Sequence, residues 1–194
     1  FLFLGIHYLV LGFENAKETL DLAAFAMTGI AGLLVFTLIG IVATIVIQSS
    51  HATLVLIITA LAAGQISYEN ALALAIGANV GTTFSAILSA LSANIAGRRV
   101  AAAHFIFNVS TGLVALAFIH PIGIAVDTGA DWLGIAEDDY TLKLALFHTL
   151  FNLIGVALML PLTDRLVHAL ETWLKPAPRK VSMPHFINDT MLAM

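Results

Sequence analysis

Between residues 22 and 97 the only charged side chain is that of Glu69. Soluble domains carry about 25% charged residues, whereas this chain has 10% charged and 60% hydrophobic residues. Hydrocarbon offers a peptide group no hydrogen-bond partner, so apolar runs of about 20 residues predict helices that cross a membrane. The sequence therefore predicts an all-α integral membrane protein, a helical bundle in contact with a lipid bilayer.

Charge and motif content argue against several other classes of protein. The formal net charge of −4 gives no basic surface for a nucleic acid, and the chain has no cysteine for disulfides or thiol chemistry. It contains no His-Glu-x-x-His motif, no Gly-x-Ser-x-Gly elbow and no acidic residue at membrane depth. We therefore expect no enzyme activity, no cofactor and no nucleic-acid partner.

One polar segment interrupts the apolar sequence at residues 48–53, Gln-Ser-Ser-His-Ala-Thr. Unpaired amides and hydroxyls are costly in hydrocarbon. Such a cluster is either bonded into the bundle or available to a polar ligand. Because polar residues inside membranes mark substrate and ion pathways, we take the second alternative as the working hypothesis.

Apolar runs lie on both sides of this segment, at 22–47 and 52–63. A helix as short as the second run is ~20 Å long, which is too short for about 30 Å of hydrocarbon. This length favours a re-entrant helical hairpin over 22–63, although two full spans joined by an ordinary loop remain the alternative. A second interruption, Gly-Ala-Asn-Val-Gly-Thr-Thr at 77–83, predicts a broken transmembrane helix over 70–96.

The C-terminal half predicts two clean spans, at 100–119 and 142–160, with an acidic loop at 120–141 between them. An amphipathic interfacial helix is expected at 163–175. Residues 176–194 are interpreted as a linker towards a missing C-terminal domain, because the sequence from 176 to 184 is basic and broken by prolines. The abrupt ends of the chain are interpreted as those of a fragment.

Basic residues orient these elements by the positive-inside rule. We expect Arg98, Arg99 and the C-terminal tail on the cytoplasmic side of the cytoplasmic (inner) membrane, and the loop 120–141 on the extracytoplasmic side.

The two interruptions supply groups that could bind an anion together with a cation. Free N–H groups at half-helix starts suit an anion, and free carbonyls suit a cation such as Na⁺. Glycines let the backbone approach a ligand, and hydroxyls and amides serve either partner. The candidate ligand residues are Gln48, Ser49, Ser50, His51, Thr53, Asn79, Gly81, Thr82 and Thr83. Back-bonding of hydroxyls within helices is the structural alternative.

The last two spans share the pattern His-x-x-Phe-Asn, in His104 to Asn108 and in His148 to Asn152. Residues four apart lie on one helix face, so each span presents a polar stripe inward. Hydrogen bonding between helices is the structural alternative to ligand binding for His104, Asn108, His148 and Asn152, which form a second tier of candidates.

These motifs, in this order, resemble the type II sodium/phosphate cotransporter family. Residues 44–53 resemble its Gln-Ser-Ser-Ser signature, and 77–83 resemble its Gly-(Ala/Ser)-Asn-Ile-Gly-Thr-Thr. Residues 98–108 and 148–152 are similar to the segments that follow. The family is built from two inverted repeats, and residues 1–175 resemble the second, so the resemblance implies one half of an inverted-repeat transporter.

The resemblance also implies a ligand set. Phosphate and sodium would be bound by the following residues: Gln48, Ser49, Ser50, Asn79, Thr82 and Thr83. His51 stands where the family usually has a third serine. The expected partners are inorganic phosphate, Na⁺ as the coupling ion, and the first repeat or a second copy of the chain.

We therefore predict a secondary active transporter that moves inorganic phosphate inward with Na⁺ by alternating access. Transport of another oxyanion, proton coupling through His51, a membrane sensor that binds phosphate without transporting it, and a bare structural module are the alternatives.

Overall fold

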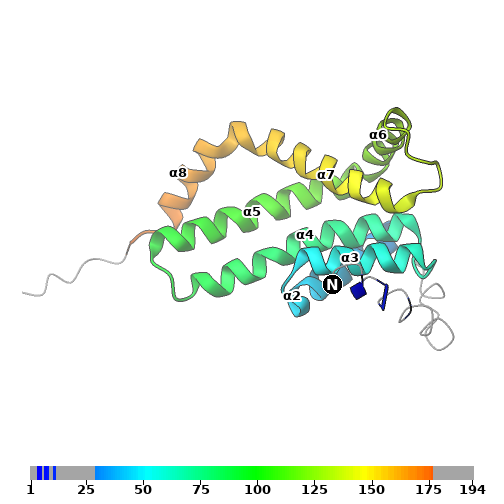
Figure 1. Cartoon of the computed structure of the whole chain (residues 1–194). Coiled ribbons are helices and arrows are strands. Elements are labelled where there is room, and N and C mark those ends of the chain that lie inside the picture. Colours follow the sequence, from blue (N-terminus) through cyan, green and yellow to red (C-terminus); the bar gives the residue numbers. More distant parts are fainter. Residues whose placement is uncertain (1–3, 6, 9–10, 12–28, 177–194) are drawn as a thin grey trace, which may run out of the picture.

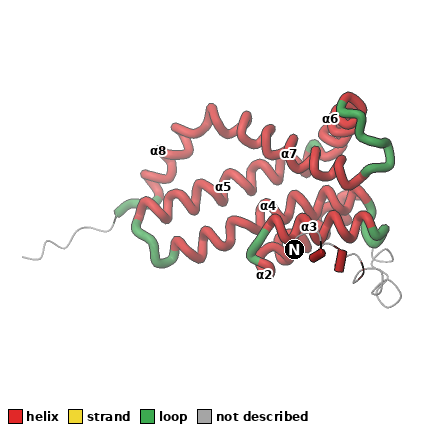
Figure 2. The backbone as a smooth tube through the Cα atoms, in the orientation of Figure 1, coloured by secondary structure: helices red, strands yellow, loops and turns green. Residues whose placement is uncertain are grey.

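The computed structural model describes residues 29–176, together with residues 4, 5, 7, 8 and 11. The expected start of the hairpin at 22–28 and the linker beyond residue 176 lie outside the described residues. Within 29–176 every regular element is a helix, and short connections join the helices in chain order (Figure 2).

Among the residues that the structure describes, four segments are long and apolar enough to cross a membrane: α2, α4, α5 and the run from α7 to α8. The prediction of an all-α integral membrane protein is confirmed. The elements are α2 (Gly29–Ile47), α3 (Ser50–Ala62), α4 (Tyr68–Ala90), α5 (Ile95–Ala117), α6 (Ile119–Trp132), α7 (Tyr140–Met159), the 3-10 turn η2 (Leu160–Leu162) and α8 (Thr163–Trp173). In Figure 1, α5 lies between α4 and α7, and α7 bends into α8 at η2.

Helix α3 is shorter than the spans and follows α2 after only two residues, Gln48 and Ser49. It begins two residues before the apolar run predicted at 52–63, so most of the polar segment belongs to the first turn of α3. Re-entry of this helix pair into the membrane stays a prediction.

Glycines bring α2 and α4 into backbone contact. A Cβ atom on Gly77 would overlap the carbonyl oxygen of Thr37, and one on Gly81 would lie 2.7 Å from the carbonyl oxygen of Ile41. Gly40 on α2 meets the α4 backbone in the same way. Small residues at four-residue spacing allow membrane helices this close approach. These glycines therefore serve helix packing.

The predicted break within 70–96 is wrong, because α4 runs without interruption from Tyr68 to Ala90. Residues 71–78 are all buried, and freed backbone groups would find no water there. Glycine lowers helix propensity by only about 1 kcal/mol relative to alanine. Close packing against α2 offsets this cost, and the helix stays whole.

The predicted loop at 120–141 is also wrong in its first part, which forms α6 (Ile119–Trp132). Pro121 lies in the first turn of α6, where a missing N–H costs no helical hydrogen bond. Ile122 and Val126 lie on its buried face, with helical spacing. Pro121 therefore lies inside a new helix that begins two residues before it, rather than in a loop.

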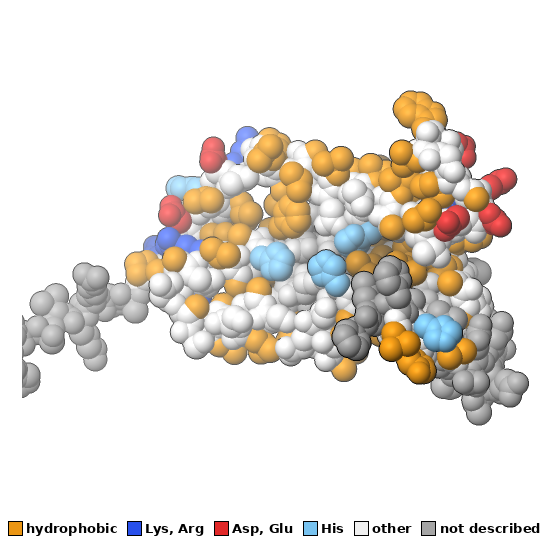
Figure 3. All heavy atoms as spheres, in the orientation of Figure 1, with side chains coloured by type: hydrophobic (Ala, Val, Ile, Leu, Met, Phe, Trp, Pro, Cys, Tyr) orange, Lys and Arg blue, Asp and Glu red, His pale blue; other side chains and the backbone are white. Residues whose placement is uncertain are grey.

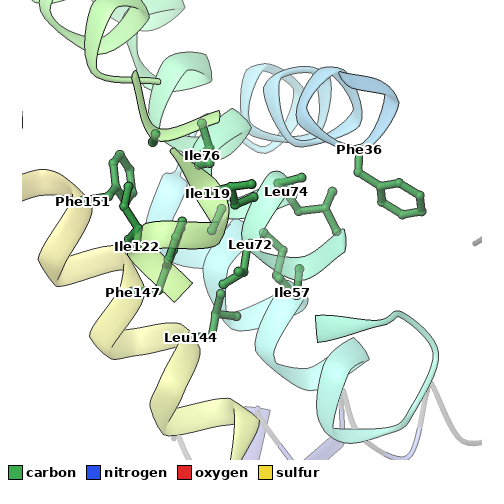
Figure 4. Packing of buried hydrophobic residues seen from close by; sticks show 14 of the residues in the cluster. Phe36, Ile57, Leu72, Leu74, Ile76, Ile119, Ile122, Leu144, Phe147 and Phe151 are labelled. Carbon is green, nitrogen blue, oxygen red and sulfur yellow. The ribbon is translucent and has the colours of Figure 1, made fainter. Parts of the chain in front are cut away.

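The apolar core is built chiefly from α4, α6 and α7, with further residues from α2, α3 and α5. Phe147 and Phe151 of α7 and Ile76 of α4 are essentially inaccessible to solvent. Figure 4 shows the side chains of Ile122 and Leu72 among this cluster. Because lipid is as apolar as this core, close van der Waals packing holds such helices together.

An ion pair with one buried partner ties α6 to α7. The Lys143 ammonium lies 2.9 Å from Oδ1 of Asp127, and the side chain of Lys143 is only 7% exposed, against 56% for Asp127. The same ammonium lies 5.7 Å from the centroid of the Tyr140 ring. Charge on Lys143 is therefore compensated chiefly by one carboxylate.

Removing the two partners of this pair should have unequal effects. We expect Asp127→Asn to lower the free energy of unfolding by about 1–2 kcal/mol, because it leaves the buried Lys143 ammonium without its carboxylate. The exposure of position 127 to solvent keeps this loss modest. Lys143→Met removes the charge and keeps the volume, so it should be neutral within about 0.5 kcal/mol. Melting temperatures of the complete detergent-solubilised protein measure both. Equal losses would show that the ion pair has no such role.

Helix α8 is docked on the start of α5 by one arginine. Arg99 donates from Nη2 to the carbonyl oxygen of Leu174 at 3.0 Å and pairs through Nη1 with Oε1 of Glu171 at 3.4 Å. Lys and Arg side chains commonly bind the free carbonyls at helix C-termini. The helix expected at 163–175 is present, and its place at the membrane interface stays a prediction, as does the cytoplasmic side for Arg98 and Arg99.

Candidate functional site

The turn between α2 and α3 holds Gln48 in an unusual backbone conformation. Gln48 has a φ of 57° and is the one non-glycine residue with positive φ in the part of the chain that the structure describes. This conformation costs a residue with a Cβ atom roughly 1–2 kcal/mol. Such strain persists where the surroundings impose it, and it clusters at functional sites. The side chain of Gln48 is exposed at this turn.

The first turn of α3 presents several hydrogen-bond donors. Ser49 is the N-cap, and its Oγ accepts from the N–H of Ala52 at 3.3 Å, which leaves the hydroxyl hydrogen free to donate. The N–H groups of Ser50 and His51 have no partner within the described residues. Because a helix N-terminus also carries partial positive charge, this end of α3 is suited to an anion.

Thr53 lies away from this end and ties α3 to α2. Its side chain is 2% exposed. Its hydroxyl bonds the carbonyl oxygen of Ser49 at 3.0 Å and lies 3.1 Å from Oγ1 of Thr44. The sequence-based interpretation did not single out Thr44, whose partner lies across the turn. Both threonines fix the geometry of the turn rather than face outward.

Helix α4 contributes Asn79 and Thr82 on a partly exposed face, while Thr83 is buried. Thr82 donates to the carbonyl oxygen of Asn79 at 2.6 Å, and Thr83 donates to that of Val80 at 2.7 Å. Both hydroxyl hydrogens are therefore used within the helix, as the structural alternative predicts, and only the oxygen lone pairs remain. Gly81 is buried against α2.

The polar stripes on α5 and α7 differ in what they reach. Asn152 on α7 accepts at Oδ1 from Nδ2 of Asn79 at 3.0 Å and donates to the carbonyl oxygen of His148 at 2.7 Å. Asn108 on α5 donates to the carbonyl oxygen of His104 at 2.9 Å and is buried. Of the two stripes, the one on α7 thus joins the α4 residues.

Histidines gather in the middle of one face, over α3, α5 and α7 (Figure 3). His51 and His104 are exposed and His148 is half-buried. Among the described residues, no three His, Asp or Glu side chains are grouped so as to hold a metal ion.

Comparison with known proteins gives one family. The model of the Na⁺/Pi-cotransporter family matches residues 1–172. A protein of Salmonella typhimurium named "Putative inorganic phosphate export protein YjbB" is 34% identical over 155 residues, which cover 75% of this chain and 27% of that protein. Its namesake in Escherichia coli K12 is 34% identical over 146 residues, 75% of this chain and 26% of that protein.

A further relative is an uncharacterised protein of Bacillus subtilis, YqeW, which is 33% identical over 136 residues, 69% of this chain and 42% of that protein. No solved structure matches the chain. The chain thus spans about a quarter of the length of the YjbB proteins it matches.

Proposed function

The chain belongs to the Na⁺/Pi-cotransporter family, and from that premise we propose that it forms one half of a sodium-coupled carrier of inorganic phosphate in the cytoplasmic membrane. The transported anion would bind where α2 meets α3, and the coupling ion would bind beside it. Transport would proceed by alternating access around this site.

The observation that carries the proposal is the open N-terminus of α3. The N–H groups of Ser50 and His51 are without partners among the described residues, and the cap hydroxyl of Ser49 keeps its hydrogen. Phosphate binds readily at helix N-termini, because the free donors and the helix dipole both favour an anion. The amide of Gln48 is exposed at the same turn and adds two donors.

Sodium would supply the full positive charge that no side chain provides, because residues 48–53 and 77–83 contain no lysine or arginine. Oxygen lone pairs are available on Thr82 and Asn79 of α4, and Na⁺ in transporters is held by such oxygens and by free backbone carbonyls. The ion would then neutralise phosphate and enter with it.

Transport would require a second half. Inverted-repeat carriers place their site at the interface between repeats, and this chain covers about a quarter of its YjbB relatives. The start of α3 and the partly exposed face of α4 that carries Asn79 and Thr82 would therefore face the first repeat or a second copy of the chain.

The test is transport by the complete protein reconstituted in liposomes. We expect an inward Na⁺ gradient to drive labelled phosphate into the vesicles, with little uptake when choline replaces Na⁺. Phosphate uptake that does not depend on Na⁺ would contradict the proposed sodium coupling. Phosphate binding without transport would favour a membrane sensor. Competition by sulfate, arsenate and dicarboxylates tests the identity of the oxyanion.

The direction of transport is read in the same vesicles. A symporter moves phosphate along the combined driving force, inward under a normal Na⁺ gradient. The YjbB relatives are named as phosphate export proteins. Vesicles loaded with phosphate are therefore assayed for phosphate efflux under inward and under outward Na⁺ gradients. Phosphate efflux that is driven by an inward Na⁺ gradient would show export rather than symport.

A further inference from the structure

The hydrogen bonds around Asn152 fix the orientation of two side-chain amides. The carbonyl oxygen of His148 can only accept, so the atom of Asn152 that lies 2.7 Å from it is Nδ2. The other end, Oδ1, then faces α4, where it lies 3.0 Å from the amide of Asn79. Because Oδ1 can only accept, the atom of Asn79 that meets it is Nδ2. The network thus assigns both amides by chemistry alone.

The consequence is that Asn79 keeps its oxygen for other partners. No described residue donates to Oδ1 of Asn79, and the residue is partly exposed. Thr82, one helical turn along α4, gives its hydroxyl hydrogen to the carbonyl oxygen of Asn79 at 2.6 Å. Its oxygen can therefore only accept. Two neighbouring oxygens on this face of α4 have acceptor capacity and no hydrogen to offer.

We infer that Asn152 is a positioning residue that turns the oxygen of Asn79 outward and thereby makes this face of α4 a surface for a cation rather than for an anion. The inference rests on the proposed function and divides its site. The start of α3 offers donors to phosphate, and the Asn79–Thr82 face offers acceptors to the coupling ion. Asn152 touches neither ligand and acts through Asn79.

A matched control exists on α5. Asn108 occupies the equivalent place in the repeated pattern and makes the same bond to the carbonyl oxygen four residues earlier, at 2.9 Å from His104. Within residues 29–176, however, its side chain makes no hydrogen bond to another helix. A difference between the two asparagines therefore reports the bond to Asn79.

The experiment measures transport by the complete reconstituted protein as a function of Na⁺ and, separately, of phosphate. We expect Asn152→Leu to raise the half-saturating Na⁺ concentration by about 10-fold or more, the effect of losing a residue that orients a metal ligand. Half-saturating phosphate at saturating Na⁺ should change less than about threefold, and Asn108→Leu should raise half-saturating Na⁺ clearly less than Asn152→Leu does. If Asn152→Leu does not reach the membrane, Asn152→Ala removes the same acceptor without adding bulk.

Asn152→Asp separates positioning from simple structure. It keeps an acceptor for Asn79, loses the bond to His148 and adds a negative charge that attracts cations, so half-saturating Na⁺ should not rise by more than about threefold. A purely structural role predicts that it is as damaging as Asn152→Leu. Wild-type dependence on Na⁺ in Asn152→Leu would overturn the inference alone, whereas a wild-type carrier indifferent to Na⁺ would overturn both this inference and the coupling.

Discussion

Gly77→Ala should prevent the complete protein from folding stably. The added methyl group would overlap the backbone carbonyl of Thr37, which belongs to a helix and cannot rotate away as a side chain would. To make room, α2 and α4 must separate, and Gly40 and Gly81 then lose their backbone contacts as well. Overpacking in a tight core costs 1–3 kcal/mol and occasionally more, and we expect about 3 kcal/mol here because the contact is rigid.

The measurement is the temperature at which the detergent-solubilised protein loses its monodisperse peak in size-exclusion chromatography. Gly123→Ala is the control, since a Cβ atom there meets nothing within 4 Å and the residue is also helical. It should be neutral or slightly stabilising, because alanine favours a helix over glycine. If both variants melt alike, backbone contact between α2 and α4 does not hold the bundle together.

The sequence predicted the spans well, because apolar content is a local property. The helices at 100–119 and 142–160 follow directly from uninterrupted runs of apolar residues, and α5 and α7 overlap them closely. The face of 163–175 predicted a helix by its spacing, and α8 lies there. Such predictions need no knowledge of what packs against the helix.

The sequence-based predictions were wrong where the structural role of a residue depends on the helix that packs against it. Gly77 weakens an isolated helix, yet against α2 it allows a close contact that preserves α4. Pro121 follows the end of α5 and occupies the first turn of α6, and only the packing of that second helix distinguishes a helix start from a loop. Partner helices, rather than intrinsic propensity, decided both cases.

The candidate site divides in the same way. The polar turn was recognisable because amides and hydroxyls are conspicuous in an apolar run, and the structure brings Gln48, Ser49 and Ser50 to one helix start. The bond between Asn79 and Asn152 joins residues far apart in the chain. Helical spacing placed each asparagine on a polar face, but which faces meet follows only from the packing of α4 against α7.

Gln48→Gly should abolish phosphate transport while leaving the fold intact or slightly more stable. Gln48 has a φ of 57°, a conformation that glycine adopts without strain. The substitution removes the amide and relieves the backbone at once, so lost transport could not be attributed to a damaged turn. Loss of a hydrogen-bonding side chain that the site requires commonly costs about 10²-fold or more in rate, and we expect uptake by the reconstituted complete protein to fall by about that factor.

Ser50→Ala tests the same start of α3 by removing a second hydroxyl. Its hydroxyl makes no hydrogen bond within the described residues, whereas Ser49 also caps the helix. Ser49→Ala should therefore lose transport and about 1 kcal/mol of stability together, while Ser50→Ala should lose transport alone. Ser89→Ala is the matched control, since that hydroxyl bonds only the carbonyl oxygen of Ser85 on an exposed face. The anion would meet donors from Gln48 and Ser50 together. If Gln48→Gly and Ser50→Ala both retain transport, phosphate does not bind at the start of α3.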